Sequence, residues 1–223
     1  MSRTPLRERT LPDYTRGQEL ANMITHIAGA VFGLVVLIWA VALSTRHEDA
    51  WAMASGCIYA LSMMVLYTVS SVYHGLRPSY GKKVMQVIDH CTIYLLITGS
   101  YTPILLAAIR PDYPAVAWAI FIAEWCLAAF ATVFTAIDHK RYSRLSMGCY
   151  IGMGWLIVLA LGPAYHSLGR EGFLWLLAGG IAYTLGAAIY GLGKKRPVLH
   201  TVFHVFVLLG SALQAVCILK YIL

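Results

Sequence analysis

Apolar stretches fill most of the chain and are separated by short polar segments. A helix that crosses about 30 Å of hydrocarbon needs about 20 apolar residues, because each residue advances about 1.5 Å along the axis. The sequence contains seven stretches of this length, at 22–44, 51–73, 85–108, 115–137, 145–163, 172–191 and 199–221. The pattern therefore predicts an all-α integral membrane protein, built as a bundle of seven transmembrane helices.

Composition excludes a soluble globular domain. Hydrophobic residues make up 59% of the 223 residues and charged residues only 12%, whereas an ordinary soluble domain has about 25% charged residues. Residues 1–18 are polar and lack the apolar segment and cleavage site of a signal peptide, so the first helix is expected to act as an uncleaved insertion signal. We therefore predict a cytoplasmic polar tail over 1–18 and one transmembrane domain over 19–223.

The basic residues predict the orientation in the membrane. Cytoplasmic loops of membrane proteins carry an excess of Lys and Arg. With the amino terminus inside, the inner segments hold 13 of the 17 basic residues and the outer segments hold 4. This split predicts a multi-pass protein of the cell inner membrane with a cytoplasmic amino terminus and an outside carboxyl terminus. It disfavours rhodopsin-like receptors, whose orientation is the inverse.

The formal net charge of +7 comes from basic residues that orient the protein in the membrane, so no nucleic-acid partner is expected. The cysteines all lie in apolar stretches and form no CxxC pair, so neither a disulfide framework nor a thiolate metal site is indicated. They are Cys57, Cys91, Cys126, Cys149 and Cys217.

Two histidines at the start of the last stretch form a candidate metal-binding pair. His200 and His204 are four residues apart, so on a helix both imidazoles face the same way. That spacing suits two ligands of one metal ion, and no acidic residue nearby is placed to pair with either ring. An HxxxH motif alone is a weak signal.

A second cluster lies where the second and third stretches meet. Ser70 precedes His74 by one turn at the end of the second stretch, and a short loop leads to Asp89 in the third. So short a loop makes the two helix ends neighbours. The predicted topology brings this cluster to the membrane depth of His200 and His204, near the cytoplasmic face.

Three imidazoles and a water form the catalytic type of zinc site, and a nearby carboxylate can hold or deprotonate that water. The alternative is that histidine and aspartate at helix ends only cap helices or meet lipid headgroups.

The same residues carry a resemblance to a known family. The segments ELANMITHIAGA (19–30), SSVYH (70–74), DHCTIYLLITGSYTP (89–103) and HTVFHVF (200–206) together resemble the haemolysin III family. That family belongs with the progestin and adiponectin receptors (the PAQR superfamily) and, more distantly, the alkaline ceramidases. The resemblance covers the chain from the first stretch to the last, and it implies a seven-helix bundle that binds zinc near the cytoplasmic face.

Carried over residue by residue, the resemblance implies His74, His200 and His204 as zinc ligands. Asp89 matches the acidic position that contacts zinc through water, and Ser70 matches the neighbouring serine. Adiponectin receptors and alkaline ceramidases hydrolyse the amide bond of ceramide-like lipids. The resemblance therefore implies a zinc-dependent hydrolase of a lipid amide or ester, whose partners are membrane lipids and whose substrate enters from the bilayer.

Four further ionisable residues are interpreted separately. His26 is expected near the site, either supporting a ligand or as a structural histidine. His90 follows Asp89 directly, so it points about 100° away and is left out of the ligand set. His139 is expected to be solvated in its loop, and Glu124 lies well inside the fourth stretch, where a carboxylate is a functional candidate by default.

Other functions remain open at this point. The protein can instead be a non-enzymatic sensor of lipid state, or a cytolytic factor, with a structural zinc closed by Asp89 as fourth ligand. An ion transporter would rest on Glu124 alone, without the repeats typical of transporters. Iron or manganese also suits three histidines beside an acid, and the sequence leaves the substrate and the oligomeric state undetermined.

Overall fold

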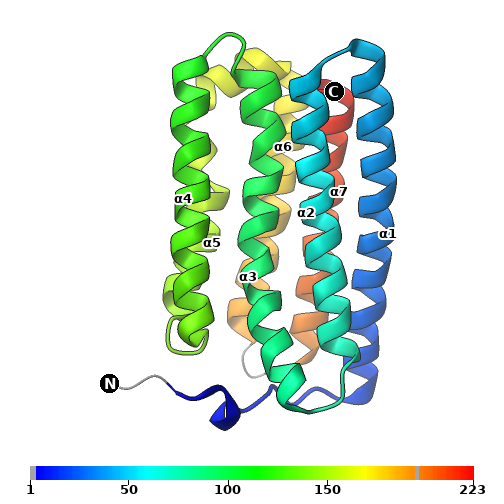
Figure 1. The fold of residues 1–223 in the computed structure, drawn as a ribbon, viewed down its shortest axis with the longest axis vertical. Helices are drawn as coiled ribbons and strands as arrows, with labels where there is room; N and C mark the ends of the chain where they lie inside the picture. Colours follow the sequence, from blue (N-terminus) through cyan, green and yellow to red (C-terminus); the bar gives the residue numbers. More distant parts are fainter. Residues whose placement is uncertain (1–3, 194–195) are drawn as a thin grey trace.

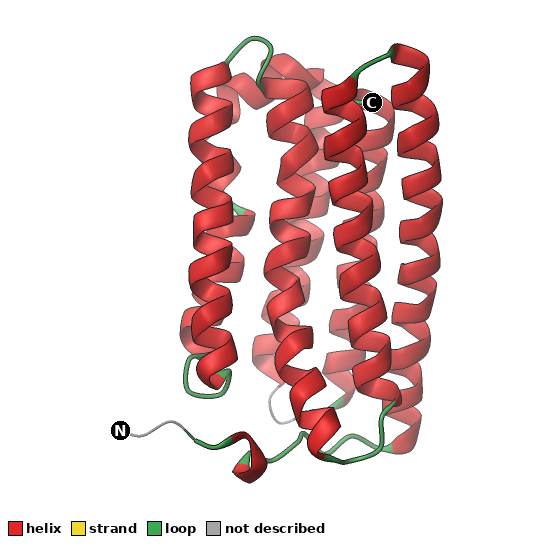
Figure 2. Ribbon diagram, in the orientation of Figure 1, coloured by secondary structure: helices red, strands yellow, loops and turns green. Residues whose placement is uncertain are grey.

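The structure, a computed structural model, describes residues 4–193 and 196–223. Arg3, Lys194 and Lys195, which entered the count of basic residues, lie outside the described residues. Within the described ranges all regular structure is helical and no strand occurs (Figure 2). The prediction of an all-α protein is confirmed.

The described residues form seven α-helices, which lie side by side as a bundle (Figure 1). They are α1 (Arg16–His47), α2 (Ala50–Gly75), α3 (Tyr80–Pro103), α4 (Pro114–Asp138), α5 (Ser143–Gly154), α6 (Leu161–Leu192) and α7 (Val198–Tyr221). Three short helical turns complete the order: η1 (Leu6–Glu8), η2 (Ile104–Ile109) and η3 (Leu156–Ala160). The two ends of the chain lie at opposite ends of the bundle (Figure 1).

Local side-chain caps explain why several helices begin before the apolar stretches do. Thr15 and Gln18 form a capping box at the start of α1, which satisfies amide groups that a helix end leaves free. Asp49 accepts hydrogen bonds from two amides in the first turn of α2, and Ser79 accepts one at the start of α3. Asp49 and Ser79 lie within the short connections from α1 to α2 and from α2 to α3.

Six helical segments in the described part of the chain are long and apolar enough to span a membrane. One of them, Ser143–Leu192, is 50 residues long and contains both stretches predicted at 145–163 and 172–191. Its helical path is interrupted at Gly169, where φ is 64° and ψ is 176°. Glycine adopts this conformation without the steric cost that a Cβ would bring. The structure therefore has six such segments where seven apolar stretches were predicted, because two of the predicted stretches lie within this one segment.

The packing of α1 fits a lipid environment. Large apolar side chains stand exposed along one side of it, including Val31, Ile38 and Trp39. Its other side packs closely on α2 through Gly29, where an added Cβ would lie 2.6 Å from Tyr67 Cγ. Small residues allow helix backbones to approach closely in membranes, where lipid covers the apolar outer faces.

Candidate metal centre

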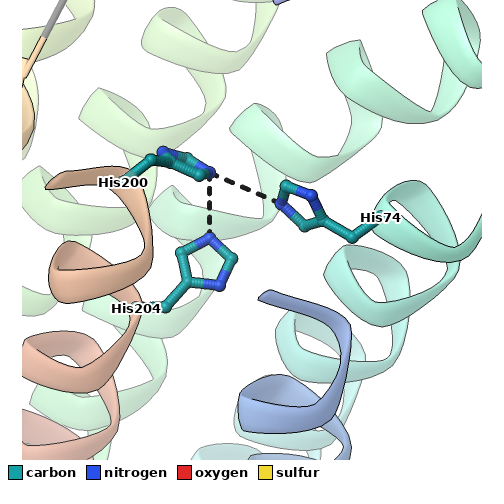
Figure 3. Close-up of side chains that lie close together, drawn as sticks. All are labelled: His74, His200 and His204. Carbon is teal, nitrogen blue, oxygen red and sulfur yellow. Dashed lines mark hydrogen bonds between the residues drawn. The ribbon is translucent and has the colours of Figure 1, made fainter. Parts of the chain in front are cut away.

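Three histidine side chains converge at the end of the bundle near the amino terminus (Figure 3). His200 Nε2 lies 3.4 Å from His74 Nε2 and 3.0 Å from His204 Nε2. Each ring offers one ligand atom, and these three atoms all lie within 4.8 Å of one another. The structure thus brings together the three predicted ligands, two from α7 and one from the last turn of α2.

Buried tyrosines on α2, which lie deeper in the bundle than the histidines, fix the register of α2 against α7. Tyr59 Oη donates a hydrogen bond to the Ser211 carbonyl at 2.8 Å, and Tyr67 Oη lies 2.6 Å from Ser211 Oγ. Both tyrosine side chains are fully buried. Because hydrogen bonds at fixed positions prevent sliding of one helix along the other, they set the depth at which His74 meets the pair on α7.

The spacing of the ring nitrogens fits a single metal ion. Nitrogen ligands lie about 2.0–2.1 Å from zinc, so two of them in tetrahedral geometry are about 3.4 Å apart. The observed separations of 3.4 and 3.0 Å are close to this value. The Nδ1 atoms of His200 and His204 are buried without a hydrogen-bond partner among the described residues. The donor set and its geometry therefore can hold one metal ion.

Glu19 orients His74 from the first turn of α1. Its carboxylate accepts a hydrogen bond from His74 Nδ1 at 2.6 Å and one from Lys82 Nζ at 2.6 Å. A hydrogen on Nδ1 leaves the Nε2 lone pair facing the other histidines, and such carboxylate–histidine pairs increase ligand basicity. This role of Glu19 was not predicted from the sequence.

A signal for this residue exists in the sequence. Glu19, Asn22 and His26 are spaced three and four residues apart, so on a helix they share one face. The Asn22 amide oxygen accepts a hydrogen bond from Thr201 on α7 at 2.7 Å. The face of α1 that carries these three polar residues therefore lies against the cluster of three histidines.

Substituting Glu19 by glutamine should weaken metal binding about 10–100-fold, the usual effect of losing a partner that orients a ligand. The neutral amide loses the charge that supports His74 and Lys82. Competition with a chelator measures the metal affinity. Glu8→Gln, an exposed carboxylate in η1, serves as the matched control. Unchanged affinity in Glu19→Gln would contradict the orienting role.

Asp89 and Ser70 line the same cavity as His200 and His204 but are not part of the ligand cluster. The Ser70 hydroxyl lies where it can donate a hydrogen bond to the Asp89 carboxylate. Asp89 comes from α3, and Ser70 lies one turn before His74 on α2. Both predicted residues therefore lie on the wall of the cavity that His200 and His204 also line.

The remaining ionisable candidates fall into different environments. The His26 ring stacks on the His204 ring with 3.8 Å between centroids, and neither of its nitrogens has a hydrogen-bond partner among the described residues. His90 Nδ1 donates to the Gln86 carbonyl at 2.8 Å, and His90 is not a member of the cluster of three histidines. Glu124 is buried and its carboxylate has no partner in the described ranges, but it is not among the residues lining the cavity.

An apolar cavity of about 160 Å³, measured as the space open to the centres of water molecules, extends from the histidines into the bundle. Aliphatic and aromatic side chains of α3, α5, α6 and α7 form most of its wall, and Gln214 on α7 also lines it. Engineered apolar cavities of about 150 Å³ bind benzene. The space beside the histidines is thus large enough for part of an apolar ligand.

The amino-terminal tail (residues 4–15) packs on this end of the bundle. Tyr14 stacks on the His200 ring with 5.1 Å between centroids. Arg9 is buried and donates hydrogen bonds to the Ile137 carbonyl at 2.7 Å and to His139 Nδ1 at 3.3 Å. Burial, with the nearby charges of His90 and Arg9, lowers the pKa of His139 to about 3. The expectation that His139 is solvated was wrong, because the tail covers it.

Comparison with known proteins identifies the family of this chain. The family model described as haemolysin-III related matches residues 14–215. A protein named Hemolysin-3 from Bacillus cereus is 39% identical, and the match covers 92% of this chain and 92% of that protein. A Hemolysin-3 homolog from Bacillus subtilis (strain 168) is 36% identical, over 93% of this chain and 96% of its own length.

A more distant human relative, named monocyte to macrophage differentiation factor, is 27% identical over 99% of this chain and 90% of that protein. No solved structure matches this chain. The family match spans the segment from the end of the tail into α7 and includes all three clustered histidines. The chain therefore belongs to the haemolysin III family.

Proposed function

We propose that this protein is a zinc-dependent hydrolase that cleaves an amide or ester bond of a membrane lipid. The observation that carries the proposal is the juxtaposition of three convergent imidazoles, the Asp89 carboxylate and an apolar cavity. A metal site built for catalysis keeps a coordination position open, whereas a structural zinc site is closed by a fourth protein ligand. In the described part of the chain the ligand cluster has three members.

Zinc is the metal that best fits three neutral nitrogen ligands at this spacing. When bound, zinc supplies Lewis acidity and makes water a nucleophile near neutral pH. The chain supports this chemistry by holding the three imidazoles rigidly, with Glu19 fixing the tautomer of His74. Buried rings and a packed tail limit the access of bulk solvent to this end of the cavity.

Asp89 handles the proton in the proposed reaction. The attacking water forms a new C–O bond at the carbonyl carbon, and its proton passes to the Asp89 carboxylate. As the C–N bond of an amide breaks, Asp89 returns this proton to the leaving nitrogen, so that a fatty acid and an amine are released. The Ser70 hydroxyl orients the carboxylate, since it lies where it can donate a hydrogen bond to it.

The cavity supports a lipid as the partner. Its wall is formed mostly by apolar side chains within helices that are apolar enough to span a membrane. An acyl chain can transfer from bilayer to cavity without exposing methylene groups to water, so the substrate enters sideways from the bilayer. Its scissile bond then lies at the histidines, at the end of the bundle.

We further propose seven membrane crossings, with the amino terminus in the cytoplasm and the carboxyl terminus outside the inner membrane. Chain ends at opposite ends of the bundle (Figure 1) support an odd number of crossings, and the break at Gly169 supports two crossings within Ser143–Leu192. The excess of basic residues in the assigned inner loops supports the orientation. Labelling of a Glu48→Cys variant without its native cysteines tests this: reaction with an impermeant reagent only after permeabilisation would reverse the orientation.

Lipid hydrolysis by the purified protein tests the proposed function. Zinc-loaded protein in vesicles that contain ceramide and other acylated lipids should release fatty acid, which mass spectrometry quantifies. A chelator should abolish release, and added zinc should restore it. Release that continues in metal-free protein would overturn the proposal, as would the absence of release from all lipid amides and esters tested.

The name Hemolysin-3 of the Bacillus cereus relative supports a second candidate function, a cytolytic protein whose zinc is structural. That reading predicts lysis of erythrocytes without release of fatty acid from their membranes. Lysis that instead requires turnover would make membrane damage a consequence of lipid cleavage.

A further inference from the structure

Gln214 is a buried polar side chain at the part of the cavity remote from the histidines. It lies on α7, is 5% exposed and lines the cavity. Its Nε2 donates a hydrogen bond to the Leu176 carbonyl at 3.1 Å. Its Oε1 is buried without a hydrogen-bond partner among the described residues.

Other polar groups around this part of the cavity are satisfied within the protein. Tyr101 Oη donates to the Gly154 carbonyl at 3.0 Å and accepts from the Ile157 amide at 2.9 Å. Tyr183 Oη lies 2.8 Å from Ser211 Oγ. A buried carbonyl oxygen without a donor is unfavourable, and a ligand that supplies a donor removes this penalty. Gln214 Oε1 is therefore an acceptor that a ligand in the cavity can use.

The amide is held in place by close packing on α6. A Cβ at Gly179 would lie 2.8 Å from Gln214 Nε2 and 2.9 Å from its Cγ, so the side chain lies directly on the glycine backbone. Together with the bond to Leu176, this contact fixes the orientation of the amide. A preorganised acceptor favours a ligand whose donor is at one position along its length.

The distance between Gln214 and the histidines sets the position of the hydrogen-bond donor along the ligand. Gln214 follows His204 by ten residues on α7, which corresponds to about 15 Å along the helix axis. A fully extended chain advances about 1.2 Å per bond, so this distance corresponds to roughly twelve bonds.

We infer that Gln214 recognises a hydroxyl group near the twelfth carbon of an acyl chain whose carbonyl end lies at the histidines. The substrate class is then an amide or ester of a fatty acid with a mid-chain hydroxyl group. The hydroxyl donates its hydrogen to Gln214 Oε1, while the rest of the chain contacts the apolar wall. This inference rests on the proposed function for the position of the carbonyl end.

Binding of free fatty acids tests this without any turnover. Purified protein in detergent should bind stearate that carries a hydroxyl on its twelfth carbon about tenfold more tightly than unmodified stearate, a factor that matches one additional hydrogen bond to a buried group. Displacement of a fluorescent fatty acid measures both affinities. Stearate with its hydroxyl on the second carbon should show no gain from Gln214.

The Gln214→Met variant keeps the length of the side chain but removes the acceptor, so the preference should disappear. Ile104→Val, which removes one methyl group from the cavity wall, should retain it. Should Gln214→Met fail to fold, Gln214→Asn, which keeps the amide but withdraws it from the cavity, replaces it. Equal binding of both acids by the unmodified protein, or a preference that persists in the Gln214 variant, would overturn the inference, as would the failure of both acids to bind.

The outcomes separate this inference from the proposed function. A hydroxyl preference in binding without any lipid hydrolysis would leave Gln214 as a recognition site and remove the hydrolase. Hydrolysis that shows no preference for hydroxylated chains would leave the hydrolase and remove the role of Gln214.

Discussion

Replacing His204 with alanine should remove the metal from the protein. The variant keeps two imidazoles of a three-member cluster, and two ligands cannot complete a stable zinc site. We expect the metal affinity to fall by more than about a hundredfold, which exceeds the loss typical of a residue that only orients a ligand. Elemental analysis of the purified protein, expressed as zinc per chain, measures the effect, and lipid turnover should be lost with the metal.

His166→Ala is the matched control for this substitution. Its side chain is 64% exposed on α6 and lies outside the cluster, so zinc content and turnover should not change. Thermal unfolding of both variants separates loss of metal from loss of fold. Stoichiometric zinc in the His204→Ala protein would show that the three histidines are not its binding site.

The substitution Asp89→Asn should separate metal binding from turnover. Asparagine has nearly the same shape but cannot accept a proton, so the rate of lipid hydrolysis should fall about 10²–10⁴-fold, the usual contribution of a general acid or base. Zinc content should stay the same, because Asp89 lies outside the ligand cluster. Elemental analysis and kcat for fatty acid release, measured on the same preparation, check both parts.

A second buried carboxylate provides the control for Asp89→Asn. Glu124 lies within α4 and is not among the residues that line the cavity, so Glu124→Gln should keep normal turnover. Loss of zinc from Asp89→Asn would identify Asp89 as a fourth ligand. The site would then be closed, and a structural role for the metal would replace the catalytic one.

Much of the fold and site follows from local patterns in the sequence. The length and apolarity of the stretches predicted a helical membrane protein, because the bilayer requires long helices in which every backbone group is paired. The four-residue spacing of His200 and His204 put both rings on one face of α7, and the short loop after α2 made Asp89 a neighbour of His74. These features depend on helix geometry and chain length, which a sequence shows directly.

Contacts between segments distant in the sequence could not be predicted from such local patterns. The bond from His74 to Glu19, the stacking of Tyr14 on His200 and the burial of His139 by Arg9 all depend on how separate elements rotate and dock. An apolar pattern predicts which helix faces are shielded from water, but either lipid or another helix can cover such a face. It therefore does not identify which helix a polar residue will meet.

The sequence by itself determined the helical membrane class and the residue types of the candidate metal centre. Only the tertiary structure decided the orienting role of Glu19, the packing of the tail and the unpaired amide oxygen of Gln214 within the cavity. The physical reason is that register between helices depends on long-range contacts such as Tyr67 with Ser211, which are 144 residues apart. Helical periodicity carries no information about such pairs.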